Sequence, residues 1–126
     1  MTNLNELAKE VGEINIANGW RDQKHEVATY LMLVVSELSE AMEADRKDEH
    51  SDFDTAKSYI DDSDNDEEFK TSFKLFVKDT FEDEIADAII RLLDLADMLG
   101  IDIEFHVRNK MRYNKTRGYH HGGKAY

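Results

Sequence analysis

Apolar residues recur three or four positions apart along most of the chain, which is the spacing of one face of an α-helix. No stretch shows the apolar and polar alternation of a half-buried β-strand. Gly19 and Gly100 follow two of the periodic stretches and are typical helix stops. The expected main helices span about 4–17, 22–47, 80–99 and 101–118. The pattern therefore predicts an all-α fold, a bundle of four to five main helices.

The segment 48–79 interrupts this pattern, and we interpret it as an acidic insertion. Its centre, Asp61 to Glu68, is an acidic, turn-prone run between two short expected helices. Phe69, Phe73 and Phe76 form a helical stripe that could pack on the rest of the protein. The tail 118–126 is too rich in glycine to stay helical.

The composition narrows the class of protein. A chain of 126 residues is typical of a single domain, so we expect one domain over 1–126. The chain has no proline, which suits long helices. It also has no cysteine, which excludes disulfides, zinc–thiolate sites and cysteine nucleophiles. Any metal site must therefore use oxygen or histidine ligands.

The net charge of −12 argues against binding to a nucleic-acid polymer, because neutralising phosphates requires lysine and arginine. The charge is unevenly distributed: from Phe105 onward there are six basic residues and no acidic one. This end of the chain could attract a small anion. Alternatively, it balances the acidic remainder or helps subunits associate.

The sequence gives no sign of export or of membrane insertion. The N-terminus lacks a basic segment followed by an apolar one, and the longest apolar run, around Leu31 to Val35, is too short to span a bilayer. We expect a soluble, cytoplasmic protein without a membrane partner.

Two acidic pairs, Glu37-x-x-Glu40 and Glu84-x-x-Asp87, lie within apolar helical segments. Residues three apart share a helix face, so each pair points in one direction. Burying such carboxylates without a partner costs several kcal/mol or more, so a compensating cation is required. Hard oxygen ligands suit Mg²⁺, with Mn²⁺ as a substitute. The pattern therefore predicts a metal site made of Glu37, Glu40, Glu84 and Asp87.

The acidic residues admit three other interpretations. The four carboxylates could be ordinary surface acids of a charge-rich chain. A di-iron bundle is disfavoured because it requires Glu-x-x-His on two helices, and neither pair has the histidine. A calcium loop starting at Asp62 fails because Glu67 stands where that loop requires glycine.

Lys110, Asn114 and Arg117 follow at offsets of four and seven, so one face of the last helix presents three phosphate donors. In isolation, a solvated basic face is the simpler interpretation of this triad. Beside a carboxylate metal site, a phosphate clamp is favoured, because metal ions bridge phosphates to carboxylates. Trp20, with Tyr30, could stack on a nucleobase, although a lone tryptophan more often belongs to a core.

These residues together resemble a known family. Glu37-Leu-Ser-Glu40, Glu84-Ile-Ala-Asp87 and Lys110-x-x-x-Asn114-x-x-Arg117, in this order, are similar to motifs of the MazG-like branch of the all-α nucleoside triphosphate pyrophosphatases. The similarity extends from Gly19-Trp20 into the tail, except for the insertion, which makes the interval between the acidic pairs longer than in compact members.

The resemblance implies Mg²⁺-dependent hydrolysis of a nucleoside triphosphate to the monophosphate and pyrophosphate, as house-cleaning of the nucleotide pool. It implies that Glu37, Glu40, Glu84 and Asp87 bind the metal and that Lys110, Asn114 and Arg117 contact phosphates. It also implies a helical bundle completed as a homodimer or homotetramer. The alternatives are a non-catalytic, acidic helical interaction protein and a hydrolase of a nucleotide diphosphate or another pyrophosphate ester.

Overall fold

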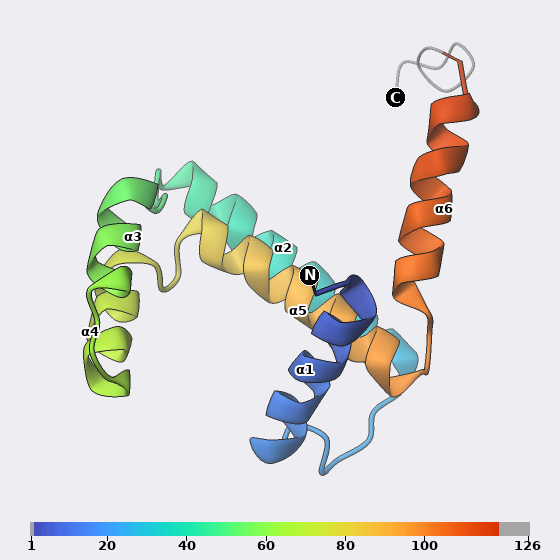
Figure 1. Cartoon of the computed structure of the whole chain (residues 1–126), viewed down its shortest axis with the longest axis horizontal. Helices are drawn as coiled ribbons and strands as arrows, with labels where there is room; N and C mark the ends of the chain where they lie inside the picture. Colours follow the sequence, from blue (N-terminus) through green and yellow to red (C-terminus); the bar gives the residue numbers. More distant parts are fainter. Residues whose placement is uncertain (1, 119–126) are drawn as a thin grey trace. The chain divides into compact units, whose positions relative to one another are not determined.

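The computed structural model describes residues 2–118 and contains six helices and no strand within them (Figure 1). The helices are α1 (Leu4–Ala17), α2 (Val27–Arg46), α3 (Phe53–Asp61), α4 (Asp66–Phe76), α5 (Phe81–Met98) and α6 (Ile103–Thr116). The predicted all-α class is confirmed, as are the two short helices expected in the insertion. Of the tail at 118–126, only Gly118 lies among the described residues. No described helix combines the length and apolar character needed to cross a membrane.

The chain divides into two compact units, one comprising Met1–Lys24 with Leu93–Tyr126 and the other His25–Leu92. Helix α5 contributes its first three turns to the second unit and its end to the first. The expectation of a single domain stays a prediction.

In the first unit, side chains of α1 and α6 accept hydrogen bonds from backbone N–H groups in each other's first turns. The backbone N–H of Leu4 donates to Glu104 Oε1 at 2.9 Å, and the N–H of Glu104 donates to Asn5 Oδ1 at 3.0 Å. Such N–H groups have no partner inside their own helix, so this exchange fixes where both helices begin. A small core of Ala8, Val11 and Leu93, with Ile103 packed on it, lies beneath.

An arginine ties the turn after α1 to the end of α5 in the same unit. Arg21 Nη2 donates to Asp94 Oδ1 at 2.5 Å and to Asp97 Oδ2 at 2.9 Å. Gly12, which is buried on α1, lies directly against this ion pair: a Cβ atom there would be 2.7 Å from Arg21 Nη2 and closer still to Asp97 Oδ2. The glycine therefore lets the ion pair approach the α1 backbone.

In the second unit, α2 begins at Val27, five residues later than the predicted start near Asp22. The residues before Val27 form turns and bends instead of helix. Gly19 has a φ of +81°, and the N–H of Asp22 bonds the carbonyl of Gly19. The N–H of His25 donates to the Tyr30 hydroxyl at 3.0 Å. Side-chain and turn bonds thus occupy groups that the apolar pattern assigned to a helix.

Helices α3 and α4 pack on each other (Figure 1). The Tyr59 and Phe76 rings are stacked, with their centres 4.6 Å apart. The acidic run interpreted as a turn is partly helical, because Asp66, Glu67 and Glu68 form the first turn of α4. Asn65 caps that turn by accepting from the N–H of Glu68 at 2.9 Å. Carboxylates are stabilised at a helix N-terminus by its macrodipole, which explains their place in the helix.

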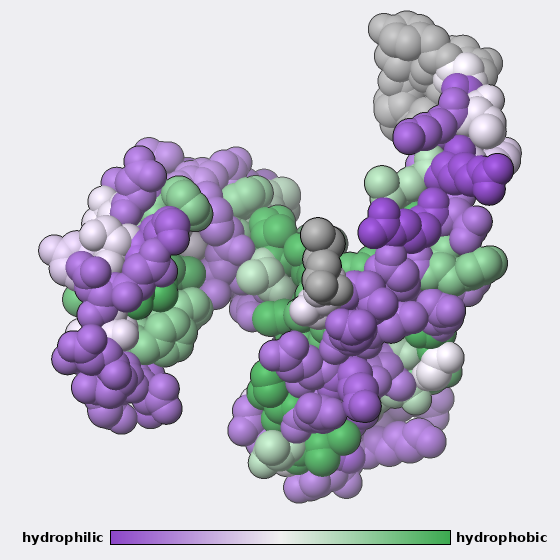
Figure 2. All heavy atoms as spheres, viewed as in Figure 1, coloured by the Kyte–Doolittle hydropathy of each residue, from purple (hydrophilic) through white to green (hydrophobic). Residues whose placement is uncertain are grey.

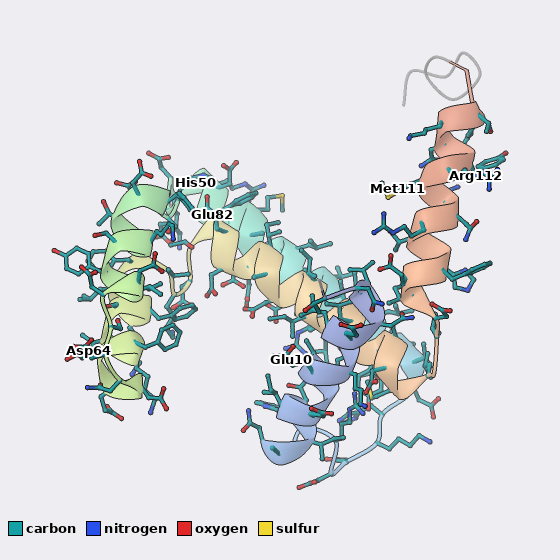
Figure 3. All side chains as sticks on the ribbon, viewed as in Figure 1. Glu10, His50, Asp64, Glu82, Met111 and Arg112 are labelled. Carbon is teal, nitrogen blue, oxygen red and sulfur yellow. The ribbon has the colours of Figure 1, made fainter. Side chains whose placement is uncertain are left out.

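The end of α2 is joined to the start of α5 through the residues that precede α3. Ser51 N–H donates to Glu82 Oε1 at 2.7 Å, and the His50 ring lies between Asp45 and Glu82 at 3.0 and 3.2 Å. Figure 3 shows the labelled His50 and Glu82 at this junction. The two carboxylates raise the pKa of His50, and the Ser51 N–H lowers the pKa of Glu82.

Side chains cap the start of α5. Thr80 Oγ1 accepts from the N–H of Asp83 at 3.3 Å, while Asp83 Oδ2 accepts from the N–H of Asp79 at 2.9 Å. The Asp83 side chain thus accepts a hydrogen bond from Asp79, the residue before the cap. Together the two bonds fix the first turn of α5.

Replacing Gly12 by alanine should destabilise the protein, although alanine normally favours a helix interior by about 0.5–1 kcal/mol. The new methyl group would displace Asp97 or Arg21 from their ion pair, at a cost of about 1 kcal/mol or more. Thermal melting of Gly12→Ala and of the exposed control Glu13→Ala measures the effect. In an Asp97→Ala background the cost of Gly12→Ala should shrink, and an equal cost in both backgrounds would contradict this explanation.

Candidate metal site

Helices α2 and α5 place buried carboxylates against each other within the second unit. Glu37 is 8 % exposed and shares its helix face with the buried residues Val34, Ala41 and Ala44. Glu84 is 6 % exposed and lies one turn before the buried Ala88 on α5. Both glutamates therefore occupy positions that an apolar side chain would normally fill, as the sequence pattern predicted.

Three of the predicted ligands come together in space. Glu37, Glu84 and Asp87 each offer a carboxylate oxygen, and these oxygens lie within 4.8 Å of one another. Oxygens that share one hard cation are separated by at most about 5 Å, since each lies roughly 2.0–2.6 Å from the ion. A single divalent cation could thus contact all three carboxylates.

The bonding of Glu84 tests whether the site fits a cation. Its Oε2 atom is buried and has no hydrogen-bond partner among the residues that the structure describes. Burial, together with the neighbouring carboxylates of Glu40, Glu37 and Asp87, raises the pKa of Glu84 to about 8. Carboxylates can satisfy this oxygen only by sharing a proton or a cation. The residues present therefore fit a divalent metal ion.

The pKa values of Glu37 and Asp87 are shifted in opposite directions. Burial acts to raise the pKa of Glu37, but its hydrogen bonds outweigh that effect and lower the pKa, above all the one from Arg91. Arg91 Nε donates to Glu37 Oε1 at 2.8 Å. Burial raises the pKa of Asp87, as do the charges of Asp83 and Glu37. Arg91 is thus the one positive group that contacts this cluster among the described residues.

Glu40, the fourth predicted ligand, is exposed. It does not belong to the group of three close oxygens, but its carboxylate interacts with those of Glu37 and Glu84. A second acidic group consists of Asp79, Asp83 and Glu84, so Glu84 is shared between the two. The role of Glu40 as a ligand stays a prediction.

The predicted phosphate-binding residues belong to the first unit, at the end of α6. Lys110 Nζ lies 5.2 Å from the centre of the Tyr113 ring, and Arg117 Cζ lies 5.6 Å from it. Arg117 is the residue that ends the helix, with an extended backbone. The structure thus brings the two cations together around Tyr113, which the sequence analysis did not single out.

Trp20 lies in the turn after α1 and is 72 % exposed. The alternative that it belongs to the core is wrong, because most of its side chain is exposed and it is absent from the Ala8 and Val11 cluster. Tyr30 is half-buried and holds the start of α2 through its hydroxyl.

Sequence reasoning missed Arg91 as a site residue. The available signal was its position four residues after Asp87 and seven after Glu84, which puts all three on one face of α5.

In comparisons with known proteins, no family model, no curated protein and no solved structure matches this chain.

Replacing Glu84 by glutamine should change how stability depends on pH. Because the pKa of Glu84 in the fold, about 8, lies above its ordinary value of 4.5, the native protein keeps a proton that the unfolded chain releases between these values. The metal-free wild type should therefore lose stability as the pH rises from about 4.5 to about 8. Glu84→Gln should lack this loss.

At pH 8 the metal-free variant should melt about 4 °C or more above the wild type, because a buried charge has been removed. Added Mg²⁺ should raise the melting temperature of the wild type but not that of Glu84→Gln. The exposed Glu43→Gln on α2 is the matched control and should behave as the wild type. Equal stabilisation of wild type and Glu84→Gln by Mg²⁺ would exclude Glu84 as a ligand.

Proposed function

We propose that this protein is a Mg²⁺-dependent pyrophosphohydrolase that converts a nucleoside triphosphate to the monophosphate and pyrophosphate. The observation that carries the proposal is the convergence of Glu37, Glu84 and Asp87, together with a buried Glu84 oxygen that has no partner among the described residues. A shared proton or a cation satisfies such a group, and a hard cation held by carboxylates is the usual means by which a protein binds a polyphosphate.

In this proposal Glu37, Glu84 and Asp87 hold Mg²⁺ or Mn²⁺, with Glu40 at the exposed edge. The bound ion supplies Lewis-acid polarisation of a phosphoryl oxygen and lowers the pKa of a bound water. Lys110, Asn114 and Arg117 bind phosphate oxygens and stabilise their charge, the arginine with fork geometry. Trp20, which is exposed, offers a face on which a base can stack.

The reaction balances without another reactant. Water oxygen bonds to the α-phosphorus, the bond from this phosphorus to the oxygen bridging it to the β-phosphorus breaks, and pyrophosphate leaves. A carboxylate of the site that is not fully engaged accepts the proton released by the water. The raised pKa of Asp87 makes it able to hold such a proton.

The direct test incubates the purified protein with a panel of ribonucleoside and deoxyribonucleoside triphosphates and Mg²⁺ and identifies the products. Monophosphate and pyrophosphate should appear in equal amounts, and Asp87→Asn should lower the rate about 100-fold or more. Glu43→Gln should leave the rate unchanged.

Two other results would point to the alternatives. Turnover of nucleotide diphosphates alone would identify a hydrolase of another pyrophosphate ester. No turnover of any substrate, together with unchanged melting in Mg²⁺, would overturn the enzymatic proposal in favour of an acidic interaction protein.

We further propose that the protein acts as a homodimer or homotetramer through one face of the second unit. Apolar residues at heptad-like spacing on α2 are each 46–51 % exposed, and two more on α5 are 51 % and 48 % exposed. They form an apolar stripe made of Leu31, Val35, Leu38, Met42, Ile89 and Leu92. Figure 2 shows green, apolar spheres over the region of α2 and α5. Exposed apolar residues at such spacing are typical of an association surface.

Replacing Leu38 by glutamate should lower the molar mass in solution to that of one chain, because a charge would be buried at the centre of the stripe. Light scattering coupled to size-exclusion chromatography measures the mass. Leu75→Glu on α4 makes the same change at a residue that is 71 % exposed outside the stripe, so its mass should match the wild type. A monomeric wild type would contradict this part of the proposal.

A further inference from the structure

Arg91 occupies an unusual position for a surface arginine. It lies on the α5 face that carries Glu84 and Asp87, and its Nε atom is held at 2.8 Å by Glu37 Oε1. The Glu37 side chain is 10 % exposed, whereas the Arg91 side chain is 41 % exposed. The guanidinium is thus anchored at its inner edge to the buried cluster and opens outward.

The outer edge of this guanidinium is available. Of the three guanidinium nitrogens of Arg91, only Nε donates a hydrogen bond within residues 2–118, and neither amino group has an acceptor there. A guanidinium presents its donors as a rigid fork that matches two oxygens of a phosphate. With the inner edge fixed by Glu37, the two amino groups form a preorganised donor pair next to the carboxylates.

The surrounding charge selects what can bind there. Four carboxylates near one arginine would repel a free anion, so the anion must arrive with a compensating cation. A phosphate chain complexed with a divalent ion meets this condition, because the ion takes the carboxylates and the phosphate takes the arginine. An acidic cluster beside a partly exposed arginine therefore suits a metal–polyphosphate better than a metal ion alone.

We propose that Arg91 is a phosphate-binding residue of this site, whose two amino groups bind oxygens of a di- or triphosphate that is complexed with a divalent cation. The inference rests on the proposed function and deepens it, since it places a phosphate donor on the same helix as the metal ligands. The rival explanation is that Arg91 only neutralises Glu37.

Calorimetric titration separates the two explanations, with Mg²⁺ alone and then with inorganic pyrophosphate in excess Mg²⁺ as the probes. Arg91→Gln should bind Mg²⁺ as tightly as the wild type or more tightly, because a repelling positive charge is gone. Its affinity for pyrophosphate should fall at least tenfold, because charge-assisted hydrogen bonds are lost. Arg91→Lys keeps the charge without the fork, so it should lose part of the pyrophosphate affinity.

The matched control is Arg46→Gln, which removes an arginine of α2 that is 65 % exposed and pairs with Glu43 at 3.6 Å. It should leave both affinities unchanged. Circular dichroism verifies that each variant is helical, and if Arg91→Gln is unfolded, the decision passes to Arg91→Lys. In that case, a Lys variant that binds pyrophosphate as tightly as the wild type overturns the proposal.

The remaining outcomes distinguish this inference from the function on which it rests. Equal pyrophosphate affinity in wild type and Arg91→Gln overturns the role of Arg91 and leaves the metal site intact. Loss of Mg²⁺ binding itself in Arg91→Gln also overturns it, because Arg91 would then act by positioning Glu37. A wild type that binds Mg²⁺ but not pyrophosphate overturns the inference, and one that binds no Mg²⁺ removes the proposed function as well.

Discussion

The burial of Glu37 and Glu84 between α2 and α5 is the constraint around which the second unit is organised. Moving a carboxylate away from water costs several kcal/mol unless a charge or a hydrogen bond compensates. Arg91 compensates Glu37, but Glu84 keeps an oxygen without a partner among the described residues. The pairing of α2 with α5 is thus less stable than it would be with apolar residues at these two positions. Binding of a proton or a cation at Glu84 offsets that cost.

The parts of this unit outside the cluster hold that arrangement in place. Asn65 and Thr80 fix where α4 and α5 begin, and the bonds of Ser51 and His50 to Glu82 attach the start of α5 to the chain that leaves α2. The acidic insertion is therefore a packed helical hairpin in continuity with this junction. Because Glu84 lies two residues beyond Glu82, these bonds also hold the stretch of backbone from which the Glu84 side chain extends.

Local periodicity was sufficient to predict most helices, since apolar spacing and caps act within a few residues. It failed at the start of α2, where the Gly19 turn and the Tyr30 hydroxyl occupy backbone groups that a helix would use. It also treated Glu37 and Glu40 as equivalent, although a residue three positions along a helix is rotated by about 60°. That rotation buries Glu37 and leaves Glu40 exposed.

The amino-acid sequence by itself determined the all-α class, the positions of the helices and the presence of acidic pairs on apolar faces, because these depend on neighbours three and four residues away. Only the tertiary structure decided which carboxylates meet, which oxygen lacks a donor, and that Arg91 reaches Glu37 across 54 positions of chain. Such contacts depend on how two helices rotate and pack against each other, and no local pattern encodes that rotation.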